Sequence, residues 1–219
     1  MKADLHIHSI FSRTAISKPE TILEMAAQRG IGIIAITDDS VLQNRRLFAD
    51  AARAYPVQVV FGQEIKLINA KRNQGEMLGL FLTQPLKSNK ASHIIAEAAA
   101  QGGITSIAHP FCERRGEFRA FDQIDDWDHV AVEVRNGRTF KKRDNQMAEE
   151  FAERLNLPAT AGSDAHTPFE IGNVYIEFDG KNAADLKRAI LNRDISIGGE
   201  PSAAIFSLLS NISRLGVSV

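Results

Sequence analysis

Two short motifs, far apart in the chain, carry side chains that commonly bind metal ions. They are His6-Ile7-His8 near the start and Asp164-Ala165-His166 far downstream. In a β-strand the side chains at positions i and i+2 leave the same face, so both ligands of each motif would point at one ion. A single His-x-His motif is usually incidental, but two such pairs in one chain favour a buried metal cluster.

Further candidate ligands directly follow apolar runs. Asp38 comes after residues 33–36, and His109 comes after residues 104–108. Such runs are typical of buried parallel strands, and a polar residue directly after one lies at the carboxyl end of the strand. Active sites of α/β barrels are built at that end, so the sequence predicts that these residues face a common site.

Strand-like and helix-like segments alternate along the chain, which predicts a parallel α/β architecture. A proline in the first turn and a glycine stop place the first helix between residues 17 and 30. Residues 66–82 resemble a hairpin that turns at Asn73-Gln74-Gly75, and residues 112–128 a loop with a short helix over the site. We predict further helices over 41–54, 91–101, 141–155 and 183–192, and strands over 31–36, 57–64, 104–109, 130–134 and 159–162.

Seven motifs, in the expected order, make the chain resemble the PHP (polymerase and histidinol phosphatase) domain superfamily of metal-dependent phosphoesterases. The resemblance extends from the start to about Asn192. The motifs are Asp4-Leu5-His6-Ile7-His8-Ser9, Ile36-Thr37-Asp38-Asp39, Gly62-Gln63-Glu64, Gly75-Glu76-Met77-Leu78-Gly79-Leu80, Ala108-His109-Pro110-Phe111, Val132-Glu133-Val134-Arg135-Asn136 and Gly162-Ser163-Asp164-Ala165-His166. It implies a single-domain, distorted (β/α)7 TIM-like barrel over residues 1–200, with residues 201–219 as a tail on the barrel or a partner.

The resemblance also implies a set of metal ligands. The first ion would be held by His6, His8, Asp164 and Glu64. Glu64 would bridge to a second ion, which His109 helps to hold, and His166 would serve a third. Glu76 stands where many relatives carry a histidine, so it is expected either to ligate the second ion or to be a solvated residue at a turn.

Two positions depart from the family pattern and put the third ion in question. Asp39 stands where a histidine is usual, and Arg13-Thr14 replace an acidic or histidine ligand. Either Asp39 binds an ion directly, as a hard oxygen donor that favours manganese, iron or magnesium over zinc, or Arg13 and Asp39 form an ion pair in the vacated space.

Such a cluster is suited to hydrolysis of phosphate esters, because divalent ions activate water and neutralise the charge that develops on phosphorus. We expect two or three ions of manganese, iron or zinc, with magnesium a further candidate, and an ion-bridging water as nucleophile. Glu64, Asp164 and His166 are the predicted catalytic residues. Arg13, Arg135 and Asn136 are the predicted substrate-binding residues, since guanidinium suits oxyanions.

Composition limits the partners. The 219 residues fit one domain, and 26 basic against 27 acidic residues give a net charge of -1, which offers no overall attraction to nucleic acid or anionic membrane. One cysteine, Cys112, excludes an intrachain disulfide and suits a reducing cytoplasm. We expect neither a leader peptide nor a membrane-spanning stretch. The sequence therefore predicts a cytoplasmic protein with a small phosphorylated substrate.

Three functions are consistent with these observations. The leading hypothesis is a hydrolase of a phosphomonoester or phosphodiester of a small or nucleotide-like molecule. A nuclease or polymerase-associated proofreading module would need a basic groove, which the balanced charge disfavours. The altered third site motivates a metal-binding regulatory module with weak or no catalysis. The substrate, the native metal and the oligomeric state are left open by the sequence.

Overall fold

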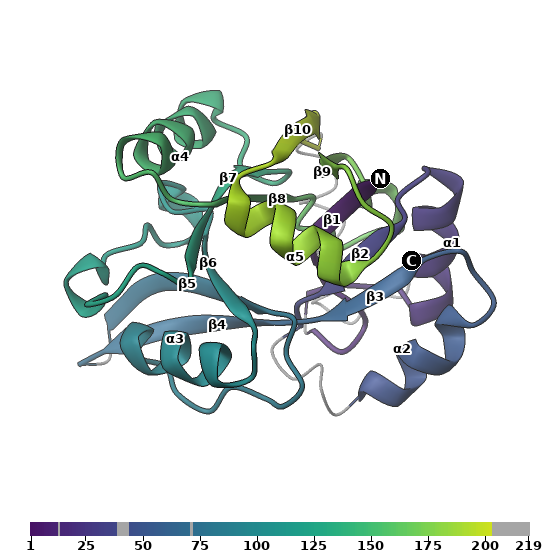
Figure 1. Cartoon of the computed structure of the whole chain (residues 1–219), viewed down its shortest axis with the longest axis horizontal. Coiled ribbons are helices and arrows are strands. Elements are labelled where there is room, and N and C mark those ends of the chain that lie inside the picture. The colour runs from purple at the N-terminus through teal and green to yellow at the C-terminus, as the bar shows by residue number, and fades with distance from the viewer. Residues whose placement is uncertain (13, 39–43, 71, 203–219) are drawn as a thin grey trace.

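Two five-stranded sheets form the fold in the computed structural model, which describes residues 1–12, 14–38, 44–70 and 72–202 (Figure 1). The first sheet has the order β10-β9-β1-β2-β3, and the second has the order β4-β5-β6-β7-β8. The strands of the first sheet are β10 (Ile195–Gly199), β9 (Val174–Phe178), β1 (Lys2–Ile7), β2 (Ile33–Ile36) and β3 (Gln58–Phe61). Those of the second are β4 (Gln63–Asn69), β5 (Arg72–Leu80), β6 (Ile104–Ala108), β7 (Val130–Asn136) and β8 (Ala159–Gly162).

Five α-helices accompany these strands in the described part of the chain. They are α1 (Pro19–Gln28), α2 (Arg45–Ala52), α3 (Ala91–Ala100), α4 (Lys142–Arg154) and α5 (Ala183–Asn192). In Figure 1, α1 and α2 lie beside the first sheet, and α3 and α4 lie beside the second. None of the described helices is long and apolar enough to span a bilayer.

The core explains why β2 is apolar at every position. Ile33 and Ala35 pack in the cluster that lies between the strands of both sheets and α5, whereas Ile34 and Ile36 pack against α1 and α2. A strand that is covered on both faces has no solvent side and therefore needs no polar alternation. The predicted buried strand after the first helix is confirmed, shortened to Ile33–Ile36.

The sheets approach each other where β1 ends. A single parallel bridge joins Ile7 to Ala165, just beyond β8, and the backbone N–H of His8 donates to the Ala165 oxygen at 2.9 Å. Asp4 strengthens this junction, because its carboxylate accepts the backbone N–H groups of Ser163 at 2.9 Å and Gly172 at 2.8 Å. The two histidine-containing motifs are thereby held side by side.

The predicted α/β class is confirmed, but the distorted (β/α)7 barrel is not found. The described strands form two mixed sheets and no closed ring. The physical reason is that antiparallel pairs interrupt the parallel order: β4 and β5 form a hairpin, and β10 pairs antiparallel with β9 although α5 connects them. Neither β9 nor β10 was predicted from the sequence.

The β4–β5 hairpin was predicted, but its turn was placed wrongly. Asn69 pairs with Arg72, so Asn73-Gln74-Gly75 lies inside β5. Gly75 has φ +99°, and a Cβ there would lie 2.6 Å from the Phe118 Cα. The turn-like residues therefore mark a close approach of the 112–128 loop to the strand.

The described chain ends beside the second sheet, where the backbone N–H of Ser202 donates to the Gly137 oxygen at 2.7 Å. Residues 203–219 of the predicted tail lie outside the described residues, so its packing and the domain boundary at residue 200 stay predictions. Arg13 and Asp39 also lie outside the described residues, and with them their predicted ion pair.

Candidate metal centre

The predicted ligands that the structure describes converge at one place. His6 and His8 come from the end of β1, Asp164 and His166 follow β8, and His109 follows β6 directly. Glu64 and Glu76 face them from the paired strands β4 and β5. All seven side chains are buried, and their donor atoms form three overlapping groups: site A (His6, His8, Glu64), site B (Glu64, Glu76, His109) and site C (His8, Asp164, His166).

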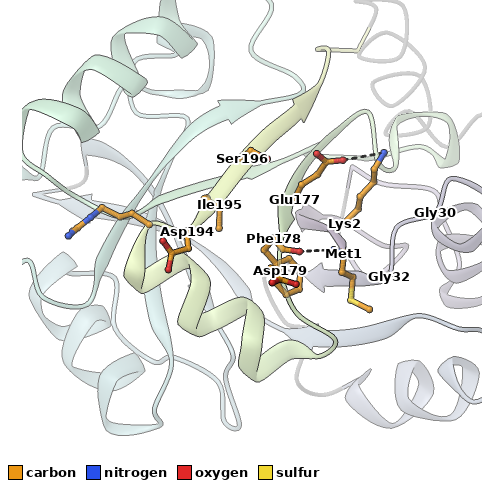
Figure 2. Close-up of a pocket in the computed structure, with 11 residues that line it drawn as sticks. Met1, Lys2, Gly30, Gly32, Glu177, Phe178, Asp179, Asp194, Ile195 and Ser196 are labelled. Atoms are coloured by element: carbon orange, nitrogen blue, oxygen red, sulfur yellow. Dashed lines mark hydrogen bonds and ion pairs between the residues drawn. The ribbon is translucent and has the colours of Figure 1, made fainter.

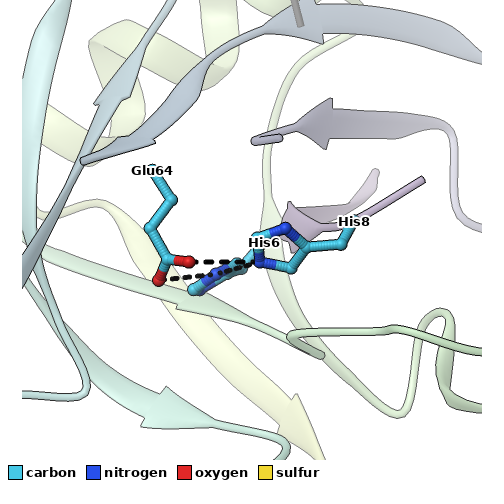
Figure 3. A group of neighbouring side chains, drawn as sticks. All are labelled: His6, His8 and Glu64. Atoms are coloured by element: carbon cyan, nitrogen blue, oxygen red, sulfur yellow. Dashed lines mark hydrogen bonds and ion pairs between the residues drawn. The ribbon is translucent and has the colours of Figure 1, made fainter. Parts of the chain in front are cut away.

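Site A joins two imidazole rings and one carboxylate (Figure 3). The Nε2 atoms of His6 and His8 lie 3.2 Å apart, and the two Glu64 oxygens lie 3.3 Å from one Nε2 each. Asp164 Oδ1 is 3.6 Å from both Nε2 atoms. Five possible donor atoms from three separate segments of the chain thus lie close together.

Partners on the far side of each ring set the histidines for metal binding. His6 Nδ1 donates to Glu133 Oε1 at 2.8 Å, and His8 Nδ1 donates to Ser12 Oγ at 3.1 Å. The Ser12 hydroxyl in turn donates to the buried Asp38 carboxylate. With the Nδ1 proton held by an acceptor, the Nε2 atom of each ring is left to bind an ion.

Site B lies across the β4–β5 pair. His109 Nε2 is 3.3 Å from Glu64 Oε1 and 3.3 Å from Glu76 Oε2. Glu76 is 9% exposed and belongs to a strand, so it is not the solvated turn residue that was the alternative. Lys66 Nζ lies 3.5 Å from its other oxygen.

Site C adds His166 to atoms that site A already uses. His166 Nδ1 donates to the Asp164 backbone oxygen at 2.8 Å, so the Nε2 atom of His166 is the one left to bind an ion. The loop that carries His166 is fixed by Glu170, which accepts the backbone N–H groups of His166 and Thr167 at 3.0 and 2.9 Å. Glu170 forms a buried pair with Arg138 at 3.3 Å.

The ionisable groups of the cluster shift one another's pKa values. Burial raises the pKa of Glu64, but the histidines around it, His6 first, hold that pKa well below its usual value. Burial lowers the pKa of His6, yet the carboxylates around it, Asp164 first, raise that pKa well above normal. Burial and the neighbouring His8 bring the pKa of His166 well below normal, so His166 is neutral and suited to bind an ion.

Two carboxylate oxygens are the strongest sign that the cluster is built for ions. Asp164 Oδ1 and Glu76 Oε2 are buried and accept no hydrogen bond from the residues that the structure describes. A buried carboxylate oxygen without a partner is costly unless a cation is near. The mixed imidazole and carboxylate donors suit manganese, iron and zinc, and the residues therefore fit the divalent ions expected from the sequence.

Backbone strain accompanies the ligands. His109 has φ +30° and Asp164 has φ +53°, conformations that non-glycine residues seldom adopt. Both residues follow strand ends, where the chain turns away while the side chain must face the cluster. Such strain persists where the surrounding structure imposes it, and it gathers at functional sites.

The structure places Asn136 and Arg135, two of the predicted substrate-binding residues, in different surroundings. Asn136 lies within the cluster, where its side-chain amide donates to Glu133 Oε2 at 3.0 Å and Asp164 Oδ2 at 3.2 Å. Arg135 instead donates to the Ile197 oxygen at 3.5 Å and lines a 490 Å³ pocket between β7, α4 and β10. Its role toward substrate stays a prediction.

Sequence reasoning missed Arg115. This residue ends the short 3₁₀ turn Glu113–Arg115 after β6, and its Nη1 donates to Asp164 Oδ2 at 2.6 Å. Its Nη2 lies 4.0 Å from Glu64 Oε1. The charged residues Glu113-Arg114-Arg115 shortly after His109 were the only sequence feature that could have indicated such a contact. Nothing in their spacing shows which of the two arginines faces the cluster.

Two pockets differ in their relation to the cluster. A 310 Å³ pocket lined by Gln63, Glu64, Ile65, Lys66 and Glu76 opens directly on site B. A larger groove of 870 Å³, shown in Figure 2, lies at the amino end of β1 around Met1 and Lys2. None of the predicted metal ligands lines the larger groove, so we assign the smaller pocket to the centre.

Comparisons with known proteins agree with the motifs. Residues 4–131 match the PHP domain family, and residues 142–195 match the family described as PHP-associated. An uncharacterised protein of Methanocaldococcus jannaschii is 32% identical over 188 residues, which are 83% of this chain and 72% of that protein. The error-prone DNA polymerase of Mycobacterium bovis is 34% identical over 107 residues, which are 46% of this chain and 10% of the polymerase.

The fold is also found among solved structures. A two-domain protein of Bacteroides vulgatus, described as containing a predicted PHP-like metal-dependent phosphoesterase, matches with a TM-score of 0.70 at 19% identity. The match covers 91% of this chain and 65% of that one. The PHP match spans more than half of the sequence and includes five of the seven candidate ligands, namely His6, His8, Glu64, Glu76 and His109. The motif-based resemblance is therefore confirmed, and the chain belongs to the PHP domain family.

Proposed function

We propose that the protein is a metal-dependent phosphoesterase that works with two divalent ions, one at site A and one at site B. The observation that carries this proposal is the position of Glu64 between the two sites. Its Oε1 lies 3.3 Å from both His6 Nε2 and His109 Nε2, and its Oε2 lies 3.3 Å from His8 Nε2. One carboxylate is therefore placed to serve both ions.

The residues of the chain have distinct tasks in this proposal. His6, His8 and Asp164 would hold one ion, and Glu76 and His109 would hold the other, with Glu64 shared. Such ions lower the pKa of water and neutralise the charge that develops on the phosphoryl group. Glu133 and Ser12 keep the histidine rings oriented, and burial of the cluster strengthens these interactions by lowering the local dielectric.

The pocket beside site B supports a small substrate. Its volume is 310 Å³, at the lower end of the range for small-molecule sites. Lys66, whose ammonium group lies 3.5 Å from Glu76, stands at its wall and offers a positive charge to an anion. We infer a phosphomonoester or a phosphodiester of a small or nucleotide-like molecule.

Activity on nucleic acid is the second candidate. The observation in its favour is the 34% identity to an error-prone DNA polymerase over 107 residues of this chain. Against it, 26 basic and 27 acidic residues provide no overall attraction to a polyanion. A nuclease would hydrolyse oligonucleotides in preference to small phosphate esters.

The test begins with protein that has been stripped of ions with a chelator. Manganese, iron, zinc or magnesium is then added back, and each form is assayed on phosphomonoesters, linear and cyclic phosphodiesters, and 5′-phosphorylated oligonucleotides. We expect ion-dependent release of phosphate or alcohol from a small ester. Preference for the oligonucleotides would support the nuclease, and tight ion binding with no hydrolysis on any substrate would support a regulatory module instead.

A matched pair of variants links activity to the centre. Glu64→Gln keeps the size of the side chain but removes the negative charge that two ions would share. Glu24→Gln makes the same change on the exposed side of α1. We expect Glu64→Gln to lose at least one ion per chain and nearly all hydrolysis, while Glu24→Gln keeps both. An active, fully loaded Glu64→Gln variant would overturn the bridging role.

A further inference from the structure

The guanidinium group of Arg115 lies against the carboxylates of the metal centre. Its Nη1 is 2.6 Å from Asp164 Oδ2, and its Nη2 is 4.0 Å from Glu64 Oε1. The side chain reaches the cluster from the turn after β6 and remains 26% exposed, so it contacts the buried acids while part of it is open to solvent. Arg115 is therefore a fixed positive charge inside the centre.

Arg115 also divides the two oxygens of Asp164 between different tasks. Oδ1 has no hydrogen-bond partner in the described part of the chain and faces His6 and His8 at 3.6 Å. Oδ2 accepts hydrogen bonds from Arg115 and from Asn136, the latter at 3.2 Å. A carboxylate that bridges two ions commonly places one oxygen on each, and here Oδ2 is already occupied by two hydrogen-bond donors.

The same accounting leaves site C short of donors among the described residues, which do not include Asp39. His8 Nδ1 is bonded to Ser12, so Nε2 is the atom that His8 can offer, and that atom already belongs to site A. Asp164 Oδ1 is likewise directed to site A. If Asp164 Oδ1 serves the ion at site A, His166 is the described site C residue whose donor atom remains free of sites A and B.

We propose that Arg115 takes the place of a third ion, so that the centre holds two divalent ions and one guanidinium. The inference rests on the proposed two-ion centre. Among the buried carboxylates, Glu64, Glu76 and Asp164 offer oxygens to the candidate sites, while Glu133 and Asp38 contact the Nδ1 atoms of His6 and His8. The guanidinium of Arg115 adds one fixed positive charge beside Asp164 and Glu64, and a guanidinium suits the oxygens of a phosphate ester.

The experiment counts ions rather than turnover. Chelator-treated protein is titrated with Mn²⁺ alone, and bound ions are counted by calorimetry and by the electron paramagnetic resonance signal of free Mn²⁺. We expect the unaltered chain to bind two ions. Arg115→Gln removes the charge and frees Asp164 Oδ2, so we expect a third ion to bind, at least about tenfold more tightly than any third ion in the unaltered chain.

Two further variants separate charge from structure. Arg115→Lys keeps the positive charge and should restore the count of two ions. Arg114→Gln removes the neighbouring arginine, whose guanidinium lies over the Phe140 ring at 5.4 Å, and should also leave two ions. A merely structural role for Arg115 would not be rescued by lysine.

The outcomes distinguish this inference from the proposed function. Three tightly bound ions in the unaltered chain would overturn the inference even if Arg115→Gln failed to fold. A count of two in both the unaltered chain and a folded Arg115→Gln variant would also overturn it while leaving the two-ion phosphoesterase intact. Failure of the unaltered chain to bind any Mn²⁺ would instead reject the metal centre itself.

Discussion

Glu133 orients His6 from behind: its Oε1 accepts a hydrogen bond from His6 Nδ1 at 2.8 Å, on the side of the ring opposite the Nε2 atom that faces Glu64. Its second oxygen accepts the backbone N–H of His109, also at 2.8 Å. One buried carboxylate thus positions a ligand of site A and a ligand of site B. Partners of this kind commonly affect metal affinity almost as strongly as the ligands do.

The first prediction is that Glu133→Gln weakens Mn²⁺ binding by about 10- to 100-fold. The glutamine side chain lacks the negative charge that stabilises the Nδ1–H form of His6. Its NH₂ group is a donor, so it cannot accept one of the two hydrogen bonds that the Glu133 oxygens accept from His6 Nδ1 and the His109 backbone. Mn²⁺ titration of chelator-treated protein measures the effect, with the exposed Glu20→Gln as control. Affinity equal to that of the control would show that Glu133 is not needed to orient His6.

The second prediction concerns the hydroxyl that supports His8. Ser12→Ala removes the acceptor of His8 Nδ1 and one of the groups that donate to Asp38. We expect Mn²⁺ affinity to fall about tenfold, less than for Glu133→Gln, because a neutral hydroxyl stabilises the ring less than a carboxylate does. Ser12→Thr keeps the hydroxyl and should restore binding. Failure of threonine to do so would point to a packing defect.

The candidate ligands could be picked out from the sequence because their types and local spacing are visible in it. His6 and His8 stand at a strand spacing, and His109 follows an apolar run. Their convergence at strand ends follows from parallel pairing, as between β6 and β7. The family resemblance added Glu64 and Glu76, which belong to an antiparallel pair and have no such local signal.

The features that sequence reasoning missed depend on contacts between distant segments. Arg115 reaches Asp164 across 49 positions of sequence, and only the fold shows that it turns inward. The barrel was expected from the family resemblance, because alternating segments alone fit an open sheet equally well. The pairing of β9 with β10 is decided by tertiary packing. Asn73-Gln74-Gly75 has the residues of a turn, yet Phe118 packs against Gly75 within the strand.

The third prediction is that Mn²⁺ stabilises the folded chain. Without ions, the carboxylates of Glu64, Glu76 and Asp164 are buried close together, which opposes folding. An ion that binds only the folded state adds about 2.7 kcal/mol to the free energy of unfolding when its concentration is 100 times Kd. Thermal unfolding in increasing Mn²⁺ should show a rising Tm. Glu64→Gln should show a smaller rise, and a Tm that is independent of Mn²⁺ would contradict ion binding at the cluster.

The fourth prediction tests how closely β1 and β8 must approach to bring the two motifs together. A Cβ on Gly162 would lie 2.5 Å from both the Cβ and the backbone nitrogen of His6, so Gly162→Ala must push the strands apart. We expect a loss of about 1–3 kcal/mol in the free energy of unfolding, typical of overpacking, together with weaker Mn²⁺ binding because His6 and Asp164 separate.

Gly102→Ala is the matched control, because Gly102 has φ +69° but no atom lies within 4 Å of a Cβ placed there. This variant should lose about 1 kcal/mol of unfolding free energy through backbone strain alone and keep its Mn²⁺ affinity. Denaturant unfolding and Mn²⁺ titration of both variants separate the two effects. Equal Mn²⁺ affinity in a destabilised Gly162→Ala variant would mean that the centre tolerates displacement of β8.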